Sequence, residues 1–195
     1  MPRPRPSVVA LAGPSGAGKS TVGPGLLRGA LSVPEFVNAD VIAQGLSAFD
    51  PDAVAISAGR VMLARLKDLA ARRATFAFET TLAGHKHAVW IRKLLSAGYD
   101  FHLVFLWLRD PELAVIRVRL RVELGGHGVP EGTVRRRYAS GLRRFFRVYQ
   151  PLATTWRLYD SSGVRPRLVA SGGRGGRTRV RDHSTWKRIQ EALAE

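Results

Sequence analysis

Eight residues near the start of the chain read Gly-Pro-Ser-Gly-Ala-Gly-Lys-Ser, a spacing that suits the phosphates of a nucleoside triphosphate. Glycines in such a loop let backbone N–H groups turn toward phosphate oxygens, because no Cβ blocks the approach. Lys19 can reach the β- and γ-phosphates, and the hydroxyl of Ser20 can bind Mg²⁺. The ATP-binding residues predicted from this motif are Gly13, Pro14, Ser15, Gly16, Ala17, Gly18, Lys19, Ser20 and Thr21, with Ser20 as the metal ligand.

A first carboxylate, Asp40, follows the next short apolar run of the chain. At the end of a strand beside the γ-phosphate, such a carboxylate can accept the proton of an attacking hydroxyl group. The alternative is that Asp40 caps a following helix, and one residue can do both. We predict that Asp40 is the catalytic base and contacts the acceptor.

A second carboxylate closes a later apolar run, in the sequence Glu79-Thr80-Thr81. Glu79 can hold an acceptor hydroxyl or a water on Mg²⁺, and the threonine hydroxyls can bond phosphate or sugar oxygens. The alternative is again a helix cap, a position that polar residues of this kind favour. The sequence predicts that Glu79, Thr80 and Thr81 bind the acceptor.

An arginine-rich segment surrounds the glycine-rich stretch 125–130. Two helices joined by such a hinge are typical of a mobile lid, and arginines closing over the γ-phosphate would stabilise the transition state. The alternative is a solvent-exposed basic helix face. The arginines are Arg117, Arg119, Arg121, Arg135, Arg136, Arg137, Arg143, Arg144 and Arg147.

Strand and helix patterns alternate along most of the chain. Apolar runs predict strands at 7–12, 35–38, 75–78, 101–108 and 156–160, with helices at 19–31, from about 50 onward, and at 88–95, 111–123 and 131–149. The tail predicts a hairpin over 167–170 and 178–181 and a helix over 185–193, capped by Ser184. Asp110 ends a strong strand as a Walker B aspartate would, but Pro111 after it favours a helix cap.

This alternation predicts an α/β P-loop NTPase fold, a parallel sheet flanked by helices and similar to the nucleotide kinases. Ligands then bind beyond the carboxyl ends of the strands, where the phosphate loop, Asp40 and Glu79 should meet. The expected organisation is one domain over 1–195, with a lid over about 117–147 and the hairpin and helix over about 165–195.

Together these residues resemble the zeta toxin family of P-loop kinases, in particular its short, single-domain bacterial members. The resemblance covers about residues 8 to 170. The segments that carry it are 13–20, 37–40, 76–82, 105–108, 121–130, 135–138 and 158–163.

The resemblance implies a kinase that transfers the γ-phosphoryl group of ATP-Mg²⁺ to a hydroxyl of a small molecule. In the better-known toxins this acceptor is UDP-N-acetylglucosamine. Asp40 matches the family's base, Lys19 and Ser20 match its Walker A ligands, and Glu79 and Thr81 match its substrate contacts. Arg121 and Arg136, chosen among Arg135–Arg137, match its phosphate-clamping arginines.

Two positions depart from the family's pattern. His85 stands where short relatives carry an arginine or lysine, which predicts an acceptor contact at His85 and a different acceptor. Ser161 stands where relatives have an asparagine that contacts adenine, which predicts a change in base selectivity.

The composition leaves other functions open. The 31 Lys and Arg against 15 Asp and Glu give a net charge of +16, which keeps a polynucleotide kinase or an RNA-associated ATPase as an alternative, although nucleic acid is not the favoured partner. A non-catalytic nucleotide sensor is the third hypothesis. The absence of cysteine and of any long apolar run predicts a cytoplasmic protein without a membrane partner, and the sequence identifies no antitoxin.

Overall fold

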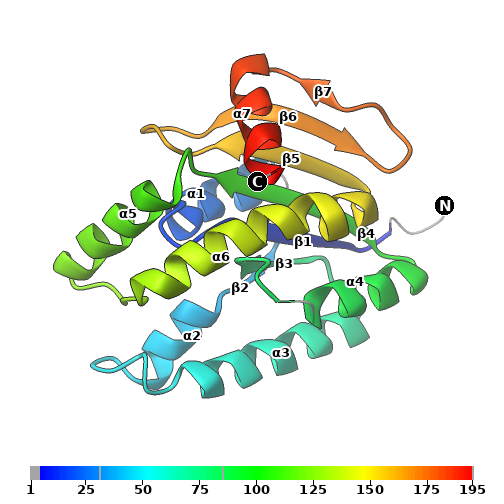
Figure 1. Ribbon diagram of the computed structural model, residues 1–195. Coiled ribbons are helices and arrows are strands. Elements are labelled where there is room, and N and C mark those ends of the chain that lie inside the picture. Colours follow the sequence, from blue (N-terminus) through cyan, green and yellow to red (C-terminus); the bar gives the residue numbers. More distant parts are fainter. Residues whose placement is uncertain (1–4, 31, 85, 195) are drawn as a thin grey trace.

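A seven-stranded sheet in the order β2-β3-β1-β4-β5-β6-β7 forms the centre of the computed structural model, which describes residues 5–30, 32–84 and 86–194 (Figure 1). The first five strands are parallel and the last two join the edge in antiparallel pairing. The strands are β1 (Ser7–Ala12), β2 (Glu35–Val37), β3 (Phe76–Thr80), β4 (Asp100–Trp107), β5 (Thr155–Asp160), β6 (Arg167–Gly173) and β7 (Arg179–Val180).

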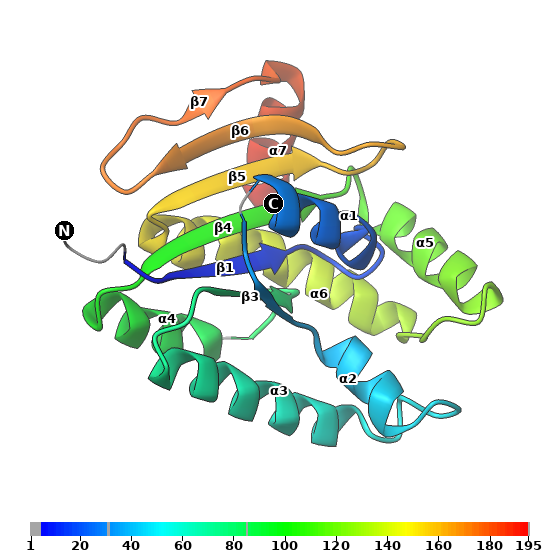
Figure 2. The same ribbon diagram turned by 180° about the vertical axis from the view of Figure 1, so that it is seen from behind.

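Helices cover both faces of the parallel part of the sheet (Figures 1 and 2). The sheet face against α3, α4, α6 and α7 forms the larger core, whereas α1 and α5 pack on the other face. The helices are α1 (Lys19–Gly25) with η1 (Leu26–Ala30), α2 (Ala39–Leu46), α3 (Ala55–Ala71), α4 (Lys86–Ser96), α5 (Pro111–Glu123), α6 (Glu131–Arg144) with η2 (Phe145–Tyr149) and η3 (Gln150–Leu152), and α7 (His183–Ala194).

Strand β1 shows why this sheet is central. Val8 and Ala10 face the larger core while Val9 and Leu11 face the opposite side, and all four are fully buried. A strand that is apolar on both faces is stable only between two layers of helices. The phosphate loop follows the carboxyl end of β1 and therefore lies at the edge of the sheet where the parallel strands end, as predicted from the sequence.

Three local predictions were wrong. A helix was considered after Asp40, with Asp40 as its cap, but α2 begins at Ala39 and its cap is Asn38. Helix α3 starts at Ala55, after a turn in which the Asp50 carboxylate accepts a hydrogen bond from the N–H of Ala53. The cap of α7 is Asp182 instead of Ser184. The hairpin strands are present, but β6 also pairs with β5, so the tail extends the main sheet.

The predicted cap at Asp110 is confirmed, since its Oδ1 accepts a hydrogen bond of 2.7 Å from the N–H of Leu113. None of the helices within the described ranges has both the length and the apolar character needed to cross a bilayer.

Replacing Asp182 by alanine should lower the free energy of unfolding by about 1 kcal/mol at neutral pH, because α7 loses its cap. Hydrogen bonds from the N–H of Thr185 and from the hydroxyls of Ser184 and Thr185 lower the pKa of Asp182 to about 2. The cap therefore stabilises the fold above the unfolded pKa near 4, and its contribution fades as the pH falls toward 2.

Urea unfolding of Asp182→Ala and wild type between pH 2 and 7 measures this difference. The control is Glu191→Gln, an exposed carboxylate on the same helix, which should change stability by less than about 0.5 kcal/mol. A difference that persists unchanged at the lowest pH would contradict the capping argument.

Candidate active site

The loop from Gly13 to Ser20 connects β1 to α1 in a conformation that requires glycine. Gly13, Gly16 and Gly18 all have positive φ, at 143°, 80° and 80°. A Cβ on Gly16 would lie 2.7 Å from the carbonyl oxygen of Ala114 on α5, and one on Gly13 would lie 2.4 Å from that of Leu106. The loop is therefore wedged between β4 and α5 by contacts that only glycine permits.

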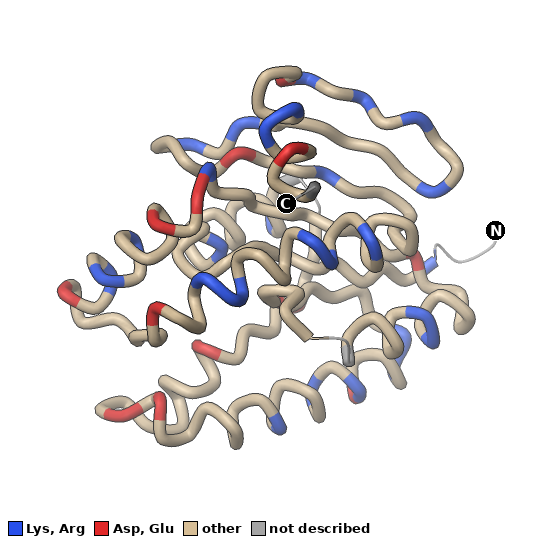
Figure 3. The backbone as a smooth tube through the Cα atoms, in the orientation of Figure 1, with Lys and Arg blue, Asp and Glu red and all other residues tan. Residues whose placement is uncertain are grey.

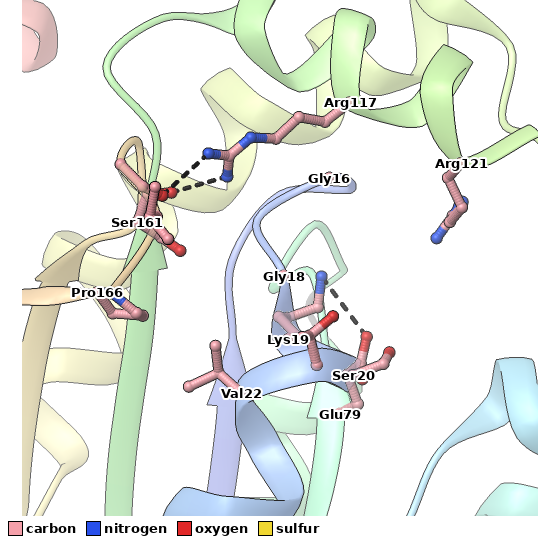
Figure 4. Close-up of a pocket in the computed structure, with 13 residues that line it drawn as sticks. Gly16, Gly18, Lys19, Ser20, Val22, Glu79, Arg117, Arg121, Ser161 and Pro166 are labelled. Atoms are coloured by element: carbon pink, nitrogen blue, oxygen red, sulfur yellow. Dashed lines mark hydrogen bonds and ion pairs between the residues drawn. The ribbon is translucent and has the colours of Figure 1, made fainter. Parts of the chain in front are cut away.

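Lys19 lies beneath this loop with only 6% of its surface exposed. Its Nζ donates a hydrogen bond of 2.9 Å to the carbonyl oxygen of Pro14 and lies 3.6 Å from Oε1 of Glu79. Burial lowers the pKa of Lys19, whereas the carboxylates of Glu79 and Asp40 favour its charged form. Figure 4 shows Lys19 close to Ser20 and Glu79, with Arg117 and Arg121 on the far side of the opening.

Glu79 links the phosphate loop to the end of β2. Its Oε2 accepts hydrogen bonds from Oγ of Ser20, at 3.0 Å, and from Nδ2 of Asn38, at 2.8 Å. Asn38 is buried and is the N-terminal cap of α2. Its Oδ1 accepts a hydrogen bond of 2.8 Å from the N–H of Asp40. Asn38 thus holds the carboxylate of Glu79 and the backbone of Asp40 in place.

Asn38 was not among the site residues predicted from the sequence. The signal was present, since an asparagine two residues before Asp40 suits a helix cap. The second contact, to Glu79, depends on the pairing of β2 with β3 and has no local signature in the sequence.

The hydroxyl of Ser20 and the carboxylate of Glu79 are the groups that could hold a metal ion. Both are hard oxygen donors beside the phosphate loop. Such a pair fits Mg²⁺, which takes one or two protein oxygens and completes its shell with waters and substrate phosphates.

Two hollows open on this edge of the sheet and meet at a common wall. The first encloses about 450 Å³ beside the phosphate loop, and the second about 180 Å³ beside Asp40. Both are lined by Lys19, Glu79 and Arg121. The first is also lined by Gly16, Gly18, Ser20, Thr21, Val22, Arg117, Ser161, Gly163, Val164 and Pro166, and the second by Ser15, Asn38, Ala39, Asp40, Thr80, Thr81, His127, Val129 and Arg137.

The structure thus brings most of the predicted residues together. Gly13, Pro14 and Ala17 line neither hollow; Gly13 and Pro14 contribute backbone contacts, and Ala17 is fully buried. Thr80 and Thr81 lie in the second hollow, where their hydroxyls accept hydrogen bonds from the N–H groups of Leu82 and Ala83. Each hydroxyl keeps its own hydrogen for donation. His85 lies outside the described residues.

The arginines divide into several sets. Arg121 lies between the hollows, whereas Arg135 pairs with Glu112, at 2.8 Å, and with Glu131. Arg136 lines neither hollow and lies 3.5 Å from Oγ1 of Thr133, while its neighbour Arg137 lines the second hollow. Among Arg135–Arg137, Arg137 is thus the one that lines a hollow of the site, and the phosphate contact expected of Arg136 stays a prediction.

Arg117 fixes a wall of the first hollow. Its guanidinium donates to the carbonyl oxygen of Ser161, at 2.7 Å (Figure 4), and to that of Ser162, at 2.8 Å. The hydroxyl of Ser161 donates to the carbonyl oxygen of Ala17, at 2.8 Å. Ser161 thus ties the end of β5 to the phosphate loop, which sequence reasoning had not foreseen at this position.

Helix α6 and the η2 turn after it are bonded to the segments that follow β3 and β4. Arg144 donates to the carbonyl oxygen of Ala83, Tyr149 to that of Gly84, and Tyr138 to that of Leu108. At the other end, His127 of the glycine-rich loop contacts Asp52 and lines the second hollow. The lid stays a prediction, and these contacts would restrict its movement to the loop and the first turns of α6.

Replacing Gly141 by alanine should weaken acceptor binding, because a Cβ there would lie 2.5 Å from the carbonyl oxygen of Thr81. The clash displaces Thr80 and Thr81, or α6, at a cost of about 1–3 kcal/mol in stability. We expect a higher KM for the acceptor with little change in the KM for ATP, measured by steady-state kinetics.

Gly132→Ala on the same helix is the matched control. No atom lies within 4 Å of a Cβ at Gly132, so alanine should leave both KM values unchanged and stability equal or slightly higher. Equal kinetic effects of the two substitutions would contradict the proposed contact.

No protein-family model matches the chain. An uncharacterized protein of Haemophilus influenzae is 27% identical over 126 residues, which cover 65% of this chain and 88% of that protein. One chain of the crystal structure of AvrRxo1-ORF1:-ORF2 with ATP matches with a TM-score of 0.74 and 16% identity. A structure of the PezAT chromosomal toxin-antitoxin system of Streptococcus pneumoniae matches with a TM-score of 0.65 and 14% identity.

The match to the AvrRxo1-ORF1:-ORF2 structure covers 95% of this chain but only 63% of that one, so the chain spans less than two thirds of its length. The match to the PezAT structure covers 98% of this chain and 88% of that one. At such identities the likeness shows the fold. The predicted α/β fold, a mostly parallel sheet flanked by helices, is confirmed, and the matched chains of the AvrRxo1-ORF1:-ORF2 and PezAT structures share it.

Proposed function

We propose that this chain is a phosphotransferase that moves the γ-phosphoryl group of ATP to a hydroxyl group of a small molecule. One observation carries the proposal. A hollow beside the phosphate loop and a hollow containing Asp40 share a wall made of Lys19, Glu79 and Arg121. A phosphoryl group that passes from one hollow to the other would move next to the positive charges of Lys19 and Arg121.

ATP would occupy the larger hollow, with its phosphates on the N–H groups of the loop. Lys19 would exchange its bond to the carbonyl oxygen of Pro14 for one to a phosphate oxygen. Ser20 and Glu79 would hold Mg²⁺, which supplies positive charge next to the phosphates. The crystal structure of AvrRxo1-ORF1:-ORF2 with ATP, which shares this fold, supports the choice of nucleotide.

The acceptor would occupy the smaller hollow, with its hydroxyl oriented by Thr80 and Thr81 and directed at Asp40. The hydroxyl oxygen forms a bond to the γ-phosphorus while the bond to the β–γ bridging oxygen breaks, and ADP leaves. The hydroxyl proton passes to the carboxylate of Asp40. Lys19, Arg121 and Arg137 neutralise the negative charge on the transferring group, which is the main catalytic contribution expected for this chemistry.

The first acceptor to test is a UDP-activated sugar such as UDP-N-acetylglucosamine, suggested by the resemblance to zeta toxins. The smaller hollow, at about 180 Å³, lies below the range of about 300–1,000 Å³ that holds a whole drug-sized ligand. Only the reacting sugar would fit inside it, and the rest of a nucleotide sugar would extend past His127 and Arg137 at the opening.

Incubation with ATP and Mg²⁺ and a panel of acceptors, read by mass spectrometry, tests the proposal. The panel contains UDP-sugars, other hydroxylated metabolites and an oligonucleotide with a free 5′-hydroxyl. We expect one small-molecule acceptor to gain a single phosphate as ADP forms. Phosphorylation of the oligonucleotide alone would favour a polynucleotide kinase, and nucleotide binding without any turnover would favour a sensor.

A further inference from the structure

On one face of the sheet edge formed by β5, β6 and β7, no helix of the described residues covers the strands. Helix α7 packs on the opposite face, where Trp186 and Ile189 join the core that contains Trp156 and Ala170. On the open side, α1 and α5 reach only β1, β4 and Tyr159 at the end of β5. Figure 2 shows these three strands in front of α7, with no described helix covering them.

Arginines occupy this open face. Arg157 on β5 pairs in register with Ser171 on β6, which pairs with Arg179 on β7, so the three side chains project on the same side of the sheet. With strands about 4.8 Å apart, the two arginines stand about 10 Å from each other. Arg177 and these two line an open groove of about 640 Å³.

The groove has no acidic residue in its lining. Its other members are Thr155, Trp156, Ser171, Gly172, Gly173, Gly176 and Thr178. None of them lines either hollow of the candidate active site, so the groove is a separate feature.

The arginines of the groove differ from those elsewhere in the molecule. Arg65 pairs with Glu35 and Asp68, and Arg135 with Glu112 and Glu131. In contrast, the exposed side chains of Arg157, Arg177 and Arg179 make no hydrogen bond or ion pair with any residue that the structure describes. Arg157 and Arg179 stand on either side of Ser171, so an anion bound there could contact both guanidinium groups.

We propose that this groove binds the phosphate backbone of single-stranded nucleic acid. Guanidinium groups form paired hydrogen bonds with phosphate oxygens, and an open groove across three strands can accommodate a flexible chain of phosphates. The net charge of +16 adds long-range attraction for a polyanion. Basic positions lie on both sides of β7 in Figure 3, and in the sequence there, residues 174–181, they are all arginines.

The groove presents no exposed aromatic ring on which bases could stack, because its one aromatic member, Trp156, is buried. Contacts to phosphates alone carry no sequence information. Binding should therefore be independent of sequence and strongly dependent on salt. This inference stands apart from the proposed kinase reaction, which uses neither the groove nor its arginines.

Fluorescence anisotropy with a labelled oligouridine and a labelled oligoadenosine, over a series of salt concentrations, tests the proposal on the full chain. Three phosphates neutralised on a single strand give a slope of about −2 for log K against log salt. The variant R157Q/R177Q/R179Q should lose this slope and bind at least about 10-fold more weakly at physiological salt.

The control is K67Q/R92Q/K93Q, which removes the same charge from exposed positions on α3 and α4, at the other end of the sheet (Figure 1). It should change the affinity by less than about threefold, since distant charges are screened. Unchanged ATP binding in both variants shows that the fold is intact.

Three outcomes would overturn the proposal. If the two triple variants lost the same affinity for the oligonucleotide, net charge alone would account for the binding. Equal affinity for a DNA duplex would exclude a groove for single strands. Equal affinity for polyglutamate at the same salt concentration would assign the groove to an acidic polypeptide.

Discussion

Replacing Asp40 by asparagine lowers kcat by about 10²- to 10⁴-fold and leaves the affinity for ATP within about twofold. Asparagine has nearly the same shape, but its amide cannot take the proton of the acceptor hydroxyl. Asp40 lines the acceptor hollow and not the nucleotide hollow, so ATP binding should be spared. The carboxylate lies at the first turn of α2, where Asn38 holds its backbone.

Steady-state ADP release with saturating acceptor gives kcat, and calorimetric titration gives the ATP affinity. Glu123→Gln, which removes an exposed carboxylate from the end of α5, is the control and should keep wild-type kcat. Near-normal turnover of the Asp40 variant would show that another group accepts the proton.

Replacing Lys19 by alanine weakens ATP binding and also lowers kcat. Loss of a hydrogen bond to a charged phosphate should weaken ATP binding by about 10- to 100-fold. Loss of a cation that acts on the transition state should lower kcat by a further factor of about 10²–10³. Lys19 lines both hollows, so its removal should affect each kinetic constant, unlike the removal of the base.

The fold should survive this substitution. Lys19 is a buried cation, and without it the carboxylate of Glu79 still accepts hydrogen bonds from Ser20 and Asn38. Thermal unfolding of the two proteins without ligand checks this point, and Lys67→Ala on α3 serves as the exposed lysine control. If ATP affinity is unchanged in Lys19→Ala, the lysine does not contact the phosphates.

The two substitutions together separate the proposed roles. A base acts after both substrates are bound, whereas a phosphate ligand acts during binding and in the transition state. We expect Asp40→Asn to change kcat alone and Lys19→Ala to change both kcat and the ATP affinity. This result would match the positions of the two residues, since Asp40 lines only the acceptor hollow and Lys19 lines both hollows.

The sequence predicted the parallel sheet and the edge at which the site lies, because strongly apolar strands and a glycine spacing are local signals. The phosphate loop, Asp40 and Glu79 could be grouped because ligands of parallel α/β sheets bind beyond the carboxyl ends of the strands. The helix at Ala39–Leu46 gave a weak signal, since eight residues with an internal glycine scarcely differ from a turn.

The choice between Arg136 and Arg137 could not be made from sequence. Adjacent residues on a helix point about 100° apart, so the rotation of α6 decides which of them enters the hollow. That rotation is set by the packing of Val134 and Leu142 into the core and by the close approach of Gly141 to Thr81. Gly141 and Thr81 are 60 positions apart in the sequence, and Val134 and Leu142 pack into two different core clusters.

The common wall of Lys19, Glu79 and Arg121 also limits how acceptor choice can diverge among proteins of this fold. A substitution in that wall changes the handling of ATP and of the acceptor at once, and most such changes would be eliminated by selection. Thr80, His127 and Val129 line the acceptor hollow and not the nucleotide hollow. Evolution, and equally a protein engineer, can exchange those three side chains for a new acceptor while the nucleotide half keeps its chemistry.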